Sequence, residues 1–245
     1  MIDPLHQFMI HPLVHFEVGG YDLSFTNSAL FMLLATVLPI LFLGAASRNS
    51  QLVPGRLQYI GESIFSFVQN LIRENVGEKG LSYTPYILSI FMFVLMGNCL
   101  GMIPYGFTFT SHIVVTFAMA MIVFIGVTII GLVKHGIHFF RLFFPEGTPL
   151  YIAPLLIPVE IMSYFTRPVS LSVRLFANMV AGHVMLKIFA GFVILLAGTS
   201  LFPLAILPFV INFAVIAFEF LVALLQAYVF TVLTCIYLND AINLH

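Results

Sequence analysis

The sequence contains very little charge. Of its 245 residues only 8% are Asp, Glu, Lys or Arg, whereas 61% are hydrophobic, and ordinary soluble domains contain about 25% charged residues. The net charge is -1, so no basic surplus points to nucleic acid and no long charged run suggests an interaction tail. These shortages argue against a soluble fold and a nucleic-acid partner. They leave a lipid bilayer as the expected environment.

Residues and motifs needed for several common sites are also missing. Tryptophan is absent, and the two cysteines, Cys99 and Cys235, each lie within an apolar stretch, so we infer neither a disulfide nor a metal site. The sequence has no H-E-x-x-H and no G-x-S-x-G motif, which disfavours known hydrolase chemistries. The N-terminus lacks the features of a signal peptide, so we treat the whole chain as mature protein. We expect no cofactor.

Long apolar runs are the main feature that is present. A helix needs about 20 apolar residues to cross a hydrocarbon layer about 30 Å thick. Residues 28–47 predict a first crossing after an outer N-terminal segment, 1–27, and residues 84–133 predict a helical hairpin. Between them, residues 55–77 place apolar side chains opposite polar ones. That pattern predicts an amphipathic helix lying along the membrane surface.

The last two apolar runs, 150–190 and 201–238, are each about twice as long as one crossing requires. Either prolines break them into shorter pieces, or each is one helix tilted roughly 60° from the membrane normal. We favour a long, strongly tilted hairpin over 150–238, turning near 191–203, because charged and amide residues recur at helical spacing. The predicted fold is an all-α membrane protein, a single domain over 1–245 with five crossings and one amphipathic interfacial helix.

Basic residues predict the orientation, because they are retained on the cytoplasmic side of a membrane. Six of the nine Lys and Arg residues fall in two loops, 48–83 and 134–149, whereas 1–27 and the turn at 104–111 contain none. We therefore expect the N-terminus outside and the C-terminus inside.

Arg174 is the basic residue that most strongly suggests a function, since a positive charge at the bilayer centre costs at least about 2.5–3.5 kcal/mol. Asn178 lies one helical turn beyond it on the same face, and Arg167 lies two turns before it. The alternative is a structural salt bridge, for which Glu160 could supply the acid. For Arg167 the structural and functional readings are balanced, and Lys187 can reach the membrane surface.

The last apolar run contains a polar stripe, because Asn212, Glu219 and Gln226 recur every seven residues. Such a stripe must face protein or water rather than lipid. It could provide interhelical hydrogen bonds alone, but a buried carboxyl can also take up and release protons. His183 is its natural partner, since imidazole titrates near neutrality. His183 lies about 13 Å along a helix from Arg174 and half a turn away from it.

Two segments resemble the signature helices of the ATP synthase subunit a family. They are PVSLSVRLFANMVAGH, residues 168–183, and FEFLVALLQAYVFTVLTCIYL, residues 218–238. Similarity also runs through FTNSALFML, GRLQYIGESIFSFVQNLI and MGNCLGMIPY, so it covers nearly the whole chain. The resemblance implies a long, tilted helix pair facing a ring of c subunits. It also implies a peripheral stalk subunit b, the rest of an F-type ATP synthase, membrane lipids and a bacterial or mitochondrial inner membrane.

The resemblance also implies roles for individual residues. Arg174 matches the essential arginine that faces the ring and separates two aqueous half-channels. Glu219 and His183 match the pair in the outer half-channel, with acid and histidine exchanged relative to some bacterial members, as in mitochondrial and alphaproteobacterial ones; either order of proton transfer stays open. Polar positions near the arginine are matched by Asn178 and Gln226, and candidate channel-lining or supporting positions by Glu160, Arg167, Asn212 and Asn98.

These features predict a non-catalytic stator subunit that has no ATP chemistry of its own. It would load and unload protons on the c-ring carboxylates and so couple proton flow to rotation and ATP synthesis; the His183 and Glu219 pair favours protons over sodium. A proton-coupled secondary transporter is the alternative, but it usually shows paired repeats and broken helices, and we see no repeat. An intramembrane hydrolase and a purely structural scaffold are weaker readings.

Overall fold

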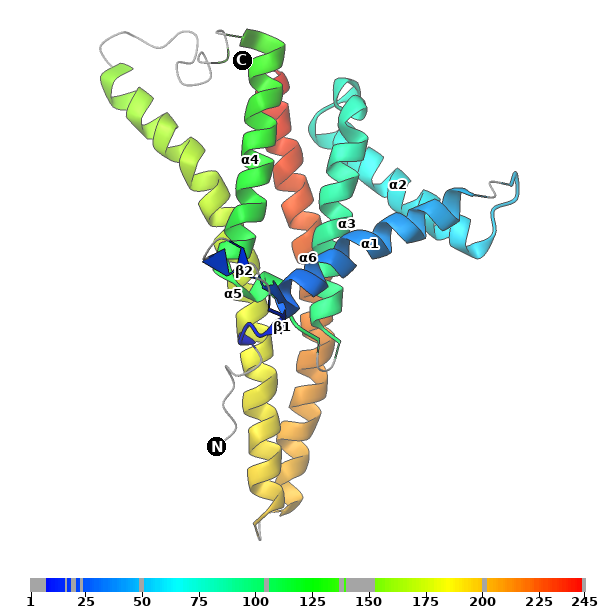
Figure 1. Ribbon diagram of the computed structural model, residues 1–245, viewed down its shortest axis with the longest axis vertical. Coiled ribbons are helices and arrows are strands. Elements are labelled where there is room, and N and C mark those ends of the chain that lie inside the picture. Colours follow the sequence, from blue (N-terminus) through cyan, green and yellow to red (C-terminus); the bar gives the residue numbers. More distant parts are fainter. Residues whose placement is uncertain are drawn as a thin grey trace. The chain divides into compact units, whose positions relative to one another are not determined.

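Helices make up nearly all of the structure, a computed structural model (Figure 1). Five of the described helices are long and apolar enough to cross a membrane, as expected of an all-α membrane protein. The structure describes residues 8–15, 17–18, 21–22, 24–48, 51–103, 106–136, 139, 153–199 and 202–243. Most of the predicted inner loop, 134–149, and part of the outer segment, 1–27, therefore lie outside the described residues.

Helices α1, α3 and α4 lie close to the ranges expected for the first crossing and the helical hairpin. They span Asn27–Ser47, Thr84–Gly101 and Ile113–His135. Each is mostly apolar, and in hydrocarbon a helix satisfies its backbone groups within one segment. Helix α1 begins where the Oγ1 atom of Thr26 accepts a hydrogen bond from the N–H of Ala29 at 3.3 Å, an N-terminal cap.

Two short strand pairs, not predicted from the sequence, precede α1. Strand β1 (Pro12–Val14) pairs antiparallel with β4 (Phe25–Thr26), and β2 (Glu17–Val18) pairs antiparallel with β3 (Tyr21–Asp22). Strands of two or three residues are too short to show an alternating pattern, so the all-α prediction missed this small addition.

Helix α2 (Arg56–Asn75) occupies the range predicted for the amphipathic helix. Its Val68, Leu71 and Ile72 side chains are buried in the protein, whereas Leu57 is exposed. An apolar side that the protein covers only in part suits a helix lying against lipid. Among the described residues, three 3-10 helices connect the longer elements: η2 (Glu78–Tyr83), η3 (Phe109–Ser111) and η5 (Phe202–Ala205).

Helices α5 (Ala153–Ala197) and α6 (Ile206–Ile242) are the longest, with 45 and 37 residues. One crossing takes about 20 residues, so each of these helices is about twice as long as a crossing requires. Helix α5 continues through Pro158 and Pro168 without interruption. Of the two readings of these runs, the continuous helix is therefore the right one. The tilt of the pair stays a prediction.

Helix α5 ends at Ala197, which lies within the range of 191–203 expected for the turn but beyond residue 190, where the apolar run was expected to end. Helix α5 runs to Ala197 because the apolar residues after Gly191 continue it. It ends where the N–H of Gly198 bonds to the carbonyl of Ile194 at 3.2 Å and that of Thr199 bonds to Leu196 at 3.1 Å.

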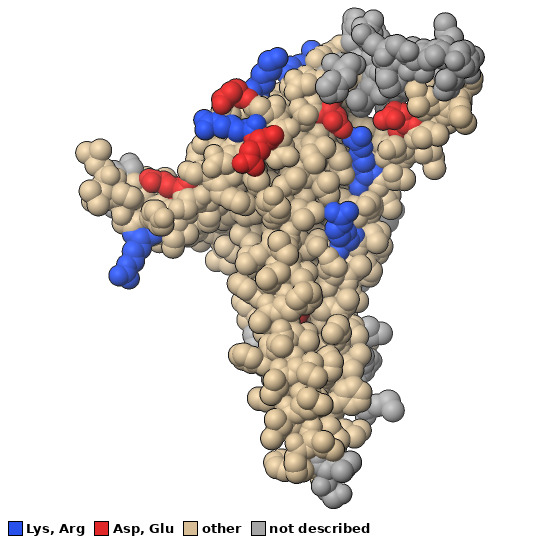
Figure 2. All heavy atoms as spheres, turned by 180° about the vertical axis from the view of Figure 1, so that it is seen from behind, with Lys and Arg blue, Asp and Glu red and all other residues tan. Residues whose placement is uncertain are grey.

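The chain forms two compact units, which we call the first and second unit. The first contains residues 1–39, 93–113 and 174–227, and the second contains 40–92, 114–173 and 228–245. Phe109 and Met179 are fully buried in the first unit, as are Ile87 and Leu238 in the second. Many other large apolar side chains are exposed, and Figure 2 shows a face on which broad areas carry no charged residue. Such surfaces suit contact with lipid or with other membrane helices.

Candidate proton-transfer site

The first unit brings together the histidine and the acid that the sequence suggested as a pair. His183 lies on α5 and Glu219 on α6, and the Nδ1 atom of His183 is 3.5 Å from the Oε1 atom of Glu219. Their side chains are only 12% and 3% exposed. Among the described residues, neither carboxyl oxygen of Glu219 has a hydrogen-bond partner. The imidazole is therefore the group best placed to exchange a proton with this carboxyl.

Gly182 provides the space that the Glu219 carboxyl occupies. A Cβ atom at this position would lie 2.7 Å from the Oε1 atom of Glu219 and 2.8 Å from its Cδ atom. Only a residue without a side chain allows the acid of α6 to lie this close to α5. The sequence offered no signal for this requirement, because it depends on which helices are neighbours.

Thr108, which was not among the predicted site residues, contacts the other ring nitrogen of His183. Its Oγ1 atom lies 3.0 Å from the Nε2 atom of His183. The same hydroxyl donates a hydrogen bond to the backbone carbonyl of Gly101 at 3.1 Å. Thr108 is buried in the connection between α3 and α4. His183 therefore has a polar contact on each ring nitrogen.

A pocket of about 700 Å³ lies beside His183 in the first unit. Lys187 also lines it, together with His11 and Asn27. Asn27 anchors the N-terminal segment, since its Oδ1 atom accepts from the N–H of His11 at 3.2 Å and its Nδ2 atom donates to the carbonyl of Met9 at 3.2 Å. The polar lining gives the imidazole a cavity in which water or a proton donor could approach it.

The remaining predicted polar residues of the first unit lie partly or wholly inside the protein. Asn98 is fully buried, and its Nδ2 atom donates to the carbonyl of Ala223 on α6 at 3.2 Å. The Oδ1 atoms of Asn98 and Asn212 are buried and have no hydrogen-bond partner among the described residues. Gln226 is half-buried. Together with Glu219, these three residues place polar atoms on α3 and α6 within otherwise apolar surroundings.

Arg174 differs from these residues because it is exposed. Asn178, one turn further along α5, is half-buried. No described acidic side chain lies within ion-pair distance of Arg174. The alternative in which Arg174 forms a structural salt bridge therefore has no partner in the part of the chain that the structure describes.

Arg167 does form an ion pair, but in the second unit and with an unexpected partner. Its Nη1 atom donates to the Oδ2 atom of Asp240 at 2.7 Å, and its guanidinium lies 5.2 Å from the ring centre of Tyr237. Glu160, the acid that a structural salt bridge of Arg174 would have used, makes no ion pair with any described residue. The sequence did not point to Asp240, because it is 73 residues away from Arg167 and lies beyond the predicted apolar run.

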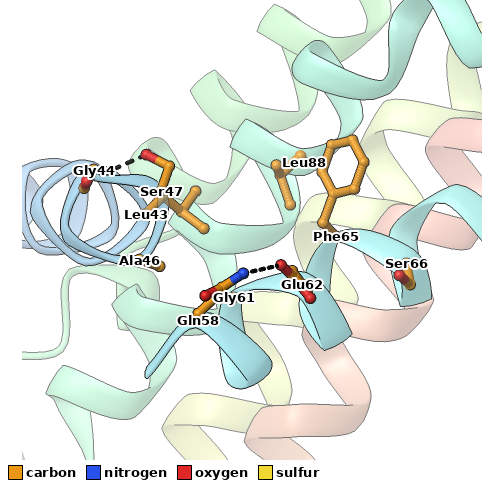
Figure 3. Close-up of a pocket in the computed structure, with 10 residues that line it drawn as sticks. All are labelled: Leu43, Gly44, Ala46, Ser47, Gln58, Gly61, Glu62, Phe65, Ser66 and Leu88. Atoms are coloured by element: carbon orange, nitrogen blue, oxygen red, sulfur yellow. Dashed lines mark hydrogen bonds between the residues drawn. The ribbon is translucent and has the colours of Figure 1, made fainter. Parts of the chain in front are cut away.

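A second pocket, of about 740 Å³, lies in the second unit between the end of α1, helix α2 and Leu88 (Figure 3). The side chain of Gln58 donates to that of Glu62 at 2.7 Å in its wall. None of the predicted proton-handling residues lines this pocket. No group of three His, Cys, Asp or Glu side chains that could hold a metal ion occurs among the described residues.

Comparison with known proteins shows the family of the chain. The family model of the ATP synthase A chain matches residues 29–239. The chain is 57% identical over 245 residues to "ATP synthase subunit a" of Rhodospirillum rubrum, with all of both chains covered. It is 53% identical over 248 residues to that of Paramagnetospirillum magneticum, again over all of both chains. It is 51% identical over 244 residues to that of Parvibaculum lavamentivorans, covering 99% of this chain and 94% of the relative. The chain therefore belongs to the ATP synthase subunit a family.

Proposed function

We propose that this chain is the proton-conducting stator of a rotary ATP synthase, in which Arg174 separates two half-channels and His183 with Glu219 loads protons onto a ring of c subunits. Membership of the family makes the chain a component of the F-type ATP synthase and a multi-pass protein of the inner membrane. The finer proposal includes contacts with the c-ring and with subunit b, and an N-terminus on the outer side.

One observation carries this proposal. The same helix, α5, presents an exposed guanidinium at Arg174 and, within the same unit, holds the imidazole of His183 against a buried acid. An exposed positive charge on a membrane helix is unfavourable unless it faces water or an anion supplied by another chain. A carboxylate on a rotating ring is such an anion.

The outer half of the cycle would use the buried pair. A proton from outside passes His183 and Glu219 and neutralises a carboxylate on the ring. Placing a neutral acid in lipid costs far less free energy than placing an ion there, so the ring can then rotate and carry the acid through the hydrocarbon. After nearly a full turn the acid loses its proton into the inner half-channel.

Arg174 would act where the ring completes its rotation. A carboxylate about 4 Å from a guanidinium is attracted by roughly 4 kcal/mol at an effective dielectric constant of about 20. The same positive charge repels a proton that would otherwise leak straight from one half-channel to the other. A guanidinium suits this task because it stays protonated in proteins, whereas a buried lysine can lose its proton and its charge.

The test replaces Arg174 with lysine in the assembled complex. We expect Arg174→Lys to abolish proton-driven ATP synthesis in membrane vesicles while the complex still assembles. Arg56→Lys is the matched control, since Arg56 is also an exposed arginine but lies on the amphipathic helix α2, and this variant should synthesise ATP normally. Normal coupled synthesis by Arg174→Lys would overturn the proposal.

A further inference from the structure

We propose that Thr108 is a positioning residue that holds His183 in the tautomer with the proton on Nε2, so that Nδ1 is the atom that exchanges a proton with Glu219. This inference rests on the proposed role of the pair in proton transfer. It adds a residue that neither the family resemblance nor the sequence pattern pointed to, and it assigns an atom to the exchange.

The direction of the hydrogen bonds follows from what each group can donate. The hydroxyl of Thr108 lies 3.1 Å from the carbonyl of Gly101 and 3.0 Å from the Nε2 atom of His183. A carbonyl can only accept a hydrogen bond, and a hydroxyl has a single proton to donate. Both bonds can form together only if the hydroxyl donates to Gly101 and accepts from an N–H at Nε2. Neutral imidazole has one N–H, so Nδ1 then carries a lone pair.

The surroundings of Thr108 prevent its hydroxyl from turning away easily. The residue is 4% exposed. A Cβ atom at Gly101 would lie 2.6 Å from its Oγ1 atom, so the hydroxyl sits directly against the backbone of α3. The carbonyl of Thr108 also accepts a hydrogen bond from the N–H of Ser111 at 3.1 Å, at the end of the 3-10 helix η3. The threonine is thus held against α3 and within the turn of η3.

With a lone pair at Nδ1, His183 can accept a proton from Glu219. The Nδ1 atom is 3.5 Å from the Oε1 atom of Glu219, and that carboxyl has no hydrogen-bond partner among the described residues. When Glu219 is protonated, its O–H bond can break as an N–H bond forms at Nδ1, which leaves a carboxylate and an imidazolium; the reverse step returns the proton. Lys187 and His11 are the other ionisable groups on the pocket beside the ring.

The opposite tautomer would behave differently. With its proton on Nδ1, neutral His183 could only donate toward Glu219, and it could not accept the proton of the carboxylic acid at that atom. Loss of the Thr108 hydroxyl removes the acceptor that holds the proton on Nε2. We therefore expect such a variant to populate both tautomers and to transfer protons more slowly.

The experiment compares three variants in the assembled complex in lipid membranes. Thr108→Val keeps the shape and loses the hydroxyl, and Thr108→Ser keeps the hydroxyl. Thr110→Val is the matched control, because Thr110 lies in the same connection, is fully buried and has no partner for its hydroxyl among the described residues. Histidine labelled with ¹⁵N reports which ring nitrogen carries the proton, and the signal of His183 is assigned by its loss in His183→Gln.

We expect His183 to be protonated on Nε2 in the wild type, in Thr108→Ser and in Thr110→Val, and to be a mixture of tautomers in Thr108→Val. Proton-driven ATP synthesis should fall about tenfold or more in Thr108→Val and recover most of the wild-type rate in Thr108→Ser. If Thr108→Val fails to assemble, the wild-type spectrum still decides the tautomer. A wild-type His183 protonated on Nδ1, or a Thr108→Val variant with an unchanged spectrum and rate, would overturn the inference. Neither result would affect the role of Arg174, which the lysine variant tests separately.

Discussion

Replacing Gly182 with alanine should slow proton transfer sharply, because the new methyl group would occupy the space of the Glu219 carboxyl. Its Cβ atom would lie 2.7 Å from Oε1, which is 0.7 Å short of the 3.4 Å at which ordinary van der Waals contact begins. Relieving such a contact costs about 1–3 kcal/mol. It also moves the acid relative to His183, and an error of about 1 Å at a reacting group can lower a rate about 100-fold. We expect Gly182→Ala to reduce the rate roughly 10-fold to 100-fold.

The assay is ATP synthesis driven by an imposed proton gradient in membrane vesicles, normalised to the amount of assembled complex. Gly191→Ala is the matched control, because Gly191 lies on the same helix and a Cβ atom there would meet nothing within 4 Å. The control should synthesise ATP at the wild-type rate. Equal rates for the two alanine variants would refute the close approach of Glu219 to α5.

The remaining predictions concern paired side chains. Glu219→Gln should slow ATP-driven proton pumping with assembly intact. Exchanging Glu219 with His183 should be better tolerated than the loss of either residue, because the exchange keeps the pair. An exchanged protein no more active than Glu219→Gln would contradict the pairing. Asp240→Asn should lower the thermal stability of the complex by about 1.5–3 kcal/mol, because Arg167 loses a charged hydrogen bond. Glu78→Gln, which breaks a more exposed ion pair, should cost at most about 1 kcal/mol, and equal losses in the two variants would argue against a special role for Asp240.

The helices could be predicted from the sequence because a bilayer imposes both a length and a composition on them. The first crossing was expected at 28–47, and α1 spans Asn27–Ser47. Prolines make the outcome for α5 harder to predict, since Pro158 and Pro168 disfavour a helix locally while the surrounding apolar run favours one. The end of α5 at Ala197 depends on the local apolar residues, and the length of a crossing does not specify it.

The candidate site could be predicted only where a single residue is unusual by itself. A carboxyl at Glu219 and an imidazole at His183 stand out in an apolar run, so their chemistry suggested a pair. Thr108 and Asp240 are ordinary residues in sequence, and they matter because folding places them next to partners 75 and 73 residues away. Gly182 is likewise important only because of what lies across from it.

The unbroken course of α5 sets the rotational phase of its side chains as well as their spacing. Each residue advances a helix by about 100° and 1.5 Å, so one alanine inserted between Arg174 and His183 would swing the imidazole to a different side of the helix while the guanidinium stayed in place. Substitutions in this stretch exchange one side chain for another. A change in its length would instead re-aim every residue beyond it, and for that reason the number of residues here should tolerate far less variation than their identity.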